Sequence, residues 1–215
     1  SSGGDMTGAI NMNGQSVSGL NQPTEDTQAA NKGYVDDVVS KAYPRNLLDN
    51  SDFQNPVNQR GISGDYQYFS SDYTIDRWIL GNRTGGRAGI KLSETGVVIS
   101  NSGGYSEFDQ YVIADTEKKY TLAVGTGDGV KILSGVPSAN PESQFLKMKA
   151  SSQGYLKCHI LIPSSEMNLY WAALYEGEYT AETLPEYHSK GYGVELAECL
   201  RYFERLGGSN SDTLG

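Results

Sequence analysis

Two histidines and two cysteines are the residues of this chain best suited to metal or nucleophilic chemistry. Cys158 and His159 are adjacent in a β-like run. Neighbouring side chains of a strand point to opposite faces, so these two cannot bind one metal ion. We therefore expect a structural thiol at Cys158 beside a surface or interface histidine, and no metal site. Cys158 and Cys199 should both be buried free thiols, because two cysteines do not make a disulfide framework and the cytosol keeps thiols reduced.

Closely spaced carboxylates are the other candidates for chemistry. Two such pairs, Asp115/Glu117 and Glu176/Glu178, have the residue types that flank a glycosidic bond in hydrolases. Pairs this close in sequence are usually solvated. No H-E-x-x-H, G-x-S-x-G, Walker or C-x-x-C motif occurs, and the run Gly125–Gly129 is expected to be a turn. The sequence thus predicts no enzyme and no cofactor, and it leaves open a structural calcium ion bound by loop carboxylates.

Tyrosine is over-represented, with 15 Tyr against five Phe. A tyrosine ring offers an apolar face for a sugar together with a hydroxyl that can hydrogen-bond. The stretches Asp65–Phe69 and Gly81–Arg87 combine aromatic and polar side chains and are the predicted glycan-binding loops. Their candidate residues are Asp65, Tyr66, Tyr68, Arg83 and Arg87. The alternative is that half or more of the tyrosines pack in the core or between subunits.

The charge balance narrows the class of partner. The chain of 215 residues carries a formal charge of −9. Five acidic and two basic side chains in residues 1–43 give −3, so the remainder carries −6. An acidic surface disfavours nucleic acid and anionic membranes as partners. No apolar run approaches a membrane span, and no signal peptide opens the sequence.

The spacing of apolar and turn residues predicts a mainly β head. Eight short runs between breakers read as strands: Gly89–Leu92, Gly96–Ser100, Tyr105–Ile113, Lys119–Gly125, Val130–Leu133, Phe145–Lys149, Tyr155–Ile162 and Asn168–Glu176. Runs at this spacing suggest a β-sandwich of the jelly-roll type. The alternation around Tyr73–Trp78 predicts one more half-buried strand, with Asp76 and Arg77 as an ion pair or exposed face. Gly193–Leu206 reads as an amphipathic helix with Val194, Leu196 and Leu200 on its apolar side.

The first 43 residues differ in pattern from the rest. Pro23–Ala42 reads as a helix of roughly four turns capped by Thr24, and Ile10–Met12 as a short strand before a turn at Asn13-Gly14. The helix is too short and polar to be stable alone, so its narrow apolar stripe should pack against other copies. We therefore divide the chain into an assembly segment over residues 1–43 and a head over 44–215, and the resemblance described next implies that the first is a trimeric shaft. The stripe predicted to trimerise is Ala30, Tyr34, Val35, Val38 and Val39.

Two resemblances accompany these patterns. The segment G-G-D-M-T-G-A-I-N-M (Gly3–Met12), followed by D-T-Q-A-A-N-K-G-Y-V-D (Asp26–Asp36), resembles the repeat of bacteriophage tail fibres, over about the first fifth of the chain. The later order N-L-L-D-N-S-D-F, N-P-V-N-Q-R-G and Y-T-I-D-R-W is similar to the start of a head domain on tail proteins of phages and prophages of gut bacteria. Tail fibres are homotrimers that carry a receptor-binding head.

The resemblance implies a virion tail protein made in the host cytoplasm. Its partners would be two further copies of itself in a parallel homotrimer, other phage tail proteins and a glycan on the host cell surface. A structural module is the alternative, in which the head only holds the trimer and recognition lies beyond Gly215. A glycan-cleaving fibre is disfavoured, because such fibres are mostly long β-helices and no repeat ladder is visible.

Overall fold

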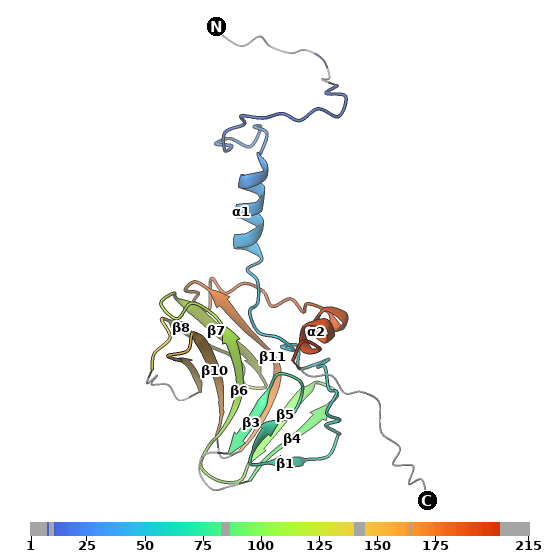
Figure 1. The fold of residues 1–215 in the computed structure, drawn as a ribbon, viewed down its shortest axis with the longest axis vertical. Coiled ribbons are helices and arrows are strands. Elements are labelled where there is room, and N and C mark those ends of the chain that lie inside the picture. Colours follow the sequence, from blue (N-terminus) through green and yellow to red (C-terminus); the bar gives the residue numbers. More distant parts are fainter. Residues whose placement is uncertain (1–7, 9–10, 83–86, 140–144, 164, 203–215) are drawn as a thin grey trace, which may run out of the picture. The chain divides into compact units, whose positions relative to one another are not determined.

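The structure, a computed structural model, describes residues 8, 11–82, 87–139, 145–163 and 165–202. The chain divides into two compact units, residues 1–43 and residues 44–215. Each is described by itself (Figure 1).

The first unit contains one helix, α1 (Lys32–Ala42), which begins later than the sequence suggests. Its N-cap is Asn31, whose side-chain oxygen accepts a hydrogen bond of 2.8 Å from the backbone N–H three residues on. Thr24 was predicted to be that cap, and this is wrong. Its backbone N–H instead donates to Gln28 Oε1 at 2.7 Å, which closes a local turn before the helix. Asn is a stronger N-cap than Thr, so the helix begins at the better cap.

The stripe predicted to trimerise lies mostly at the surface of this unit. Val35, Val38 and Val39 are 45%, 46% and 51% exposed, Ala30 is exposed and Tyr34 is half-buried. The turn at Asn13-Gly14 is present, with positive φ at both residues. Asn11 and Met12 are not in a strand, and Ile10 lies outside the described residues.

The second unit is a pair of antiparallel sheets, as expected of a β-sandwich (Figure 1). Sheet A has the order β1 (Gln67–Phe69), β4 (Ala88–Ser93), β5 (Gly96–Asn101), β11 (Glu166–Glu176), β7 (Tyr120–Thr126) and β8 (Gly129–Gly135). Sheet B has the order β2 (Ser71–Tyr73), β3 (Ile79–Asn82), β6 (Ser106–Ile113), β10 (Tyr155–Ile162) and β9 (Leu146–Ala150). All eight predicted runs are strands, with ends shifted by no more than two residues.

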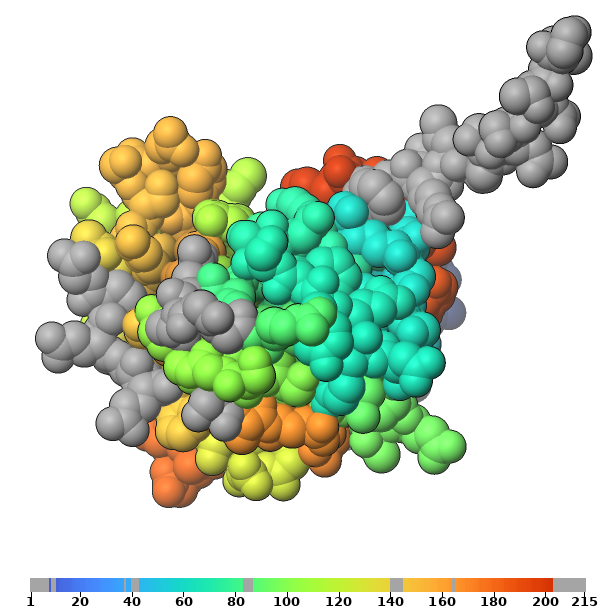
Figure 2. Space-filling model, turned by 90° about the horizontal axis from the view of Figure 1, so that it is seen from below, coloured from blue at the N-terminus to red at the C-terminus, as the bar shows by residue number. Residues whose placement is uncertain are grey.

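The core lies between the two sheets and has an aromatic centre. The Trp78 ring stacks on Phe108 with centroids 4.8 Å apart, and it meets Phe53 edge-on at 5.1 Å. All three side chains are fully buried. Seen from below, the teal surface of residues 50–80 lies against the green surface of the strands that follow, as the β1–β4 and β3–β6 pairings require (Figure 2).

The strand predicted at Tyr73–Trp78 is wrong. β2 ends at Tyr73, and a tight turn leads to β3, with the Thr74 N–H bonded to the Trp78 carbonyl at 2.9 Å. The alternation fails because consecutive residues here are buried, and Asp76 accepts from Gln59 at 2.7 Å rather than facing solvent. Arg77 has a φ of 70° and its Nε bonds to Asp49, 2.9 Å away.

The C-terminal helix α2 (Tyr192–Cys199) is shorter than predicted and turned the other way. Val194 and Leu200 are 52% and 41% exposed, whereas Glu195 is 2% exposed. The carboxylate of Glu195 accepts hydrogen bonds from the backbone N–H groups of Asn50 and Ser51. Two buried donors need an acceptor, so the acidic side chain faces inward and the predicted apolar face does not. Residues 203–206 of the predicted helix lie outside the described residues.

Candidate functional site

Tyr66 and Tyr68 lie side by side on the outer face of sheet A. They flank Gln67 along β1, so strand alternation points both rings away from the core. Tyr68 pairs with Gly89 on β4, and a Cβ built on that glycine would stand 3.0 Å from the Tyr68 ring and 3.2 Å from Tyr66. The absence of a side chain at Gly89 therefore lets both rings lie close on the sheet. Their centroids are 6.3 Å apart, and Tyr68 is 50% exposed.

Charged side chains surround the two rings. The Arg87 guanidinium carbon lies over the Tyr68 ring at 4.2 Å, and the Lys91 ammonium lies over the Tyr66 ring at 4.4 Å. The Tyr66 hydroxyl donates to Glu166 on β11. Partial burial, followed by this bond and the charge of Glu166, raises the pKa of Tyr66 well above its ordinary value. We call Tyr66, Tyr68, Arg87, Lys91 and Glu166 the aromatic patch.

The patch unites three of the five predicted glycan-binding residues. Tyr66, Tyr68 and Arg87 belong to it. Asp65 is exposed beside it in a turn, where its N–H is 3.3 Å from Ser63 Oγ. Arg83 lies outside the described residues. The sequence analysis did not predict Lys91 and Glu166 as part of this site. They lie on β4 and β11, and the strand pairings that bring them near Tyr66 cannot be read from the sequence.

A sugar can stack on the ring face of Tyr68 that Arg87 covers only if the Arg87 guanidinium moves away. A cation over an exposed aromatic ring contributes about 0.5–1 kcal/mol, so a sugar that takes its place must recover that amount. Arg87 is exposed, and a guanidinium displaced from the ring remains close enough to bond a sugar hydroxyl. The patch is thus chemically suited to a neutral polyol with an apolar face.

Other tyrosines serve packing, as the alternative in the sequence analysis supposed. Tyr187 stacks on Trp171 with centroids 4.9 Å apart and planes within 9°. Tyr175 and Tyr179 meet edge-on at 6.1 Å. These rings hold the chain that follows β11 against the outer face of sheet A.

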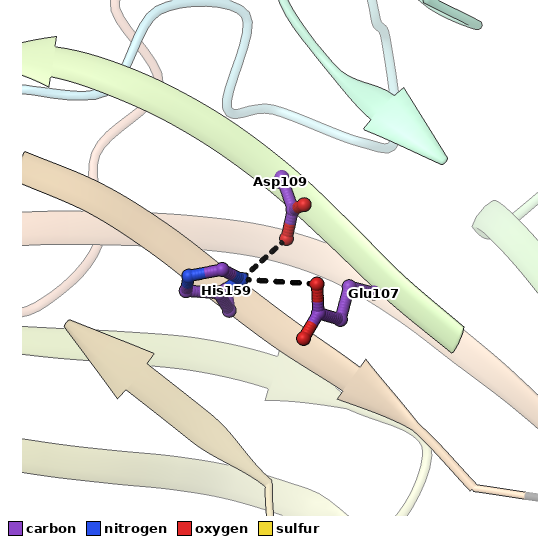
Figure 3. A group of neighbouring side chains, drawn as sticks. All are labelled: Glu107, Asp109 and His159. Carbon is purple, nitrogen blue, oxygen red and sulfur yellow. Dashed lines mark ion pairs between the residues drawn. The ribbon is translucent and has the colours of Figure 1, made fainter. Parts of the chain in front are cut away.

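A second group of functional side chains lies on the outer face of sheet B. Asp109 on β6 is directly opposite His159 on β10, and Glu107 lies two residues before Asp109. His159 Nδ1 is 2.9 Å from Asp109 Oδ1 and 3.5 Å from Glu107 Oε2 (Figure 3). Lys157 Nζ is 2.7 Å from the other Asp109 oxygen, Oδ2. We call Glu107, Asp109, His159 and Lys157 the acid–histidine cluster.

The prediction that His159 lies at a surface or interface is wrong for the single chain, where it is 5% exposed. Burial alone would lower the pKa of His159, but the nearby carboxylates of Asp109 and Glu107 outweigh it, so the pKa is raised. Alternating charges within E-F-D and K-C-H were visible in the sequence. These side chains meet because of the register between β6 and β10, and that register was not visible in the sequence.

Of the two acidic pairs considered for hydrolysis, Glu176/Glu178 form surface ion pairs, whereas in the other pair Asp115 Oδ1 accepts from the Glu117 N–H at 3.0 Å. Glu176 bonds Lys118 at 2.7 Å and Glu178 bonds Lys119 at 2.6 Å. All four side chains are at least half exposed. Glu176 and Glu178 are thus each neutralised by a lysine.

Cys158 and Cys199 are buried free thiols. Burial raises the pKa of Cys199 to about 12, and it raises that of Cys158 further. Neither thiol is therefore poised as a nucleophile.

Comparison with known proteins identifies no relative, since no protein family, curated protein or solved structure matches the chain. Among the described residues, no helix is long and apolar enough to cross a membrane.

Proposed function

We propose that this chain is the receptor-binding part of a phage or prophage tail fibre and that it attaches to a neutral glycan on the host cell surface. In this proposal residues 1–43 form a trimeric shaft and the sandwich is a jelly-roll head. The observation that carries the binding function is the placement of Tyr66 and Tyr68, side by side on an open sheet face.

The chemistry of the patch favours a sugar over other ligands. Two tyrosine rings supply apolar surface, while Arg87, Lys91 and Glu166 supply donors and acceptors at its edge. The overall charge of −9 disfavours a polyanion. The candidate carboxylates Glu176 and Glu178 are each paired with a lysine, so binding without cleavage is the expected activity.

Trimerisation would multiply a weak contact. A shallow site of this size suits an affinity in the millimolar range, roughly −4 kcal/mol. Three parallel copies can raise avidity by a factor on the order of 10²–10⁴. The exposed Val35, Val38 and Val39 on α1 are the surface through which three copies would associate. Light scattering should give three times the 23.3 kDa chain mass, and Val38→Asp should lower it.

The decisive experiment displays the protein on beads and exposes them to host cells and a glycan panel. Tyr66→Ala and Tyr68→Ala should abolish adhesion while the trimer stays intact. Tyr192→Ala is the matched control, because Tyr192 is 47% exposed and lies on α2, outside the patch. Adhesion that survives both patch substitutions would place the site elsewhere.

A structural module remains the competing function. It is favoured by the exposed valine stripe, which can serve assembly whether or not the head binds a glycan. Wild-type beads that ignore both cells and glycans while the protein is trimeric would decide for it.

A further inference from the structure

The acid–histidine cluster is a group of buried polar side chains on the outer face of sheet B, so it is not part of the core between the two sheets. Glu107, Asp109 and His159 are 7%, 1% and 5% exposed. Burying charges is costly unless they are paired or bind a metal ion. The three side chains contribute one potential ligand atom each, and these atoms all lie within 4.8 Å of one another. Side chains of these types occur together in divalent-metal sites.

The direction of the contacts separates this group from an ordinary ion pair. His159 Nδ1 is close enough to Asp109 Oδ1 for a hydrogen bond, at 2.9 Å. Among the residues that the structure describes, however, neither ring nitrogen of His159 has a partner in hydrogen-bonding direction. Figure 3 shows Nδ1 turned toward the space that both carboxylates border.

The separations match those between ligands of one ion. With metal–ligand bonds of about 2.1 Å, two ligands at a right angle are about 3.0 Å apart, and two at a tetrahedral angle about 3.4 Å. The observed distances from Nδ1 are 2.9 Å to Asp109 and 3.5 Å to Glu107. The two carboxylate oxygens are held only within the 4.8 Å bound, and rotation about the bonds of the Glu107 side chain can close that gap.

We infer that Glu107, Asp109 and His159 form a binding site for a divalent transition-metal cation, for which Zn²⁺ is the first probe. The imidazole nitrogen selects against Mg²⁺ and Ca²⁺, which prefer all-oxygen ligands. Three protein ligands leave at least one position on the ion for water or another oxygen ligand.

Lys157 is consistent with this assignment, because its ammonium does not occupy the position proposed for the ion. Its ammonium bonds Oδ2 of Asp109 at 2.7 Å, while the opposite oxygen, Oδ1, faces His159. It is 4.0 Å from Glu107 Oε2. Ligating carboxylates in metal sites are commonly held by such an outer hydrogen bond.

The ion would tie β6 to β10 across their pairing, so its binding should stabilise the whole sandwich. Full-length protein, freed of metals with EDTA and exchanged into metal-free buffer with a phosphine reductant, is titrated with ZnCl₂ by calorimetry. We expect one Zn²⁺ per chain. At about 100-fold excess over Kd, the melting temperature should rise by roughly 5–10 °C. CaCl₂ should bind at least tenfold more weakly, and tighter Ca²⁺ binding would overturn the assigned class of ion.

Variants locate the site. His159→Gln and Glu107→Gln should each weaken Zn²⁺ binding at least about tenfold and remove the thermal shift. His188→Gln is the matched control, because it removes the other histidine, which lies in the loop before α2. If His159→Gln does not fold, Glu107→Gln decides, since Glu107 is the least buried of the three proposed ligands. The inference fails if the wild type binds no Zn²⁺, or if Glu107→Gln binds it as the wild type does.

Discussion

The outer faces of the two sheets handle charge in opposite ways. On sheet A, cations rest on exposed tyrosine rings, and each contact is weak enough for a ligand to replace it. On sheet B, Asp109, His159 and Lys157 are enclosed and mutually dependent. A surface built for reversible binding keeps its charges solvated. A buried charged group is costly when any of its partners is lost, so the fold must hold all of them in place.

The largest effect is expected from Asp109→Ala. It removes the carboxylate that both Lys157 and His159 face, and a buried charge left without its partner costs about 3–5 kcal/mol. Urea unfolding in EDTA measures this loss. Asp65→Ala, an exposed aspartate beside the aromatic patch, is the control and should stay within about 0.5 kcal/mol of the wild type. Equal losses of stability for Asp109→Ala and Asp65→Ala would show that the charges on sheet B are no more important for the fold than those on sheet A.

A smaller effect is expected from pH. The folded pKa of His159 is raised above its ordinary value of 6.5, so the folded state holds this proton more tightly than the unfolded state. The contribution of protonated His159 to the free energy of unfolding is complete below pH 6.5, and it is lost as the pH rises through the folded pKa. The free energy of unfolding in EDTA, wild type minus His159→Gln, should therefore decline above pH 6.5. A flat difference between pH 5 and 9 would show that the pKa of His159 is the same in the folded and unfolded states.

Tyr66→Phe tests the face of sheet A. It deletes the hydroxyl that bonds Glu166 and keeps the ring. Because the bond is exposed, we expect a loss of stability of at most about 1 kcal/mol, and a larger fractional loss of glycan adhesion. Melting curves and bead adhesion report the two quantities separately. A stability loss as large as that of Asp109→Ala would mean that this face is also built for rigidity.

Gly89→Ala should change stability least. The new Cβ would stand 3.0 Å from the Tyr68 ring, so exposed rings must shift by a few tenths of an ångström. Replacing strand glycine also recovers about 0.5–1 kcal/mol of backbone entropy, and the two effects nearly cancel. Adhesion should nevertheless fall, because the spacing of the rings changes. Unchanged adhesion would indicate that ring position does not matter for binding.

Local patterns predicted the strands well, because alternation is a property of consecutive residues. The stretch Asp65–Phe69 was predicted to be a loop, whereas Gln67–Phe69 form β1, and it is this strand that places Tyr66 and Tyr68 on one face. Partners across strands were not predictable: His159 meets Asp109 through a register set by residues some 50 positions apart. The orientation of α2 was predicted wrongly, because hydrophobic spacing cannot reveal that Asn50 and Ser51 need Glu195 as their acceptor.

The bond from Asn50 to Glu195 spans 145 residues and has a consequence for how the chain is made. The loop around Asn50 is synthesised 145 residues before Glu195, the acceptor of its N–H groups. The Lys190 ammonium, which bonds the Leu48 carbonyl at 2.8 Å, arrives equally late. Long-range closures of this kind slow folding. The contacts between α2 and the loop around Asn50 can therefore form only after residue 195 has been synthesised.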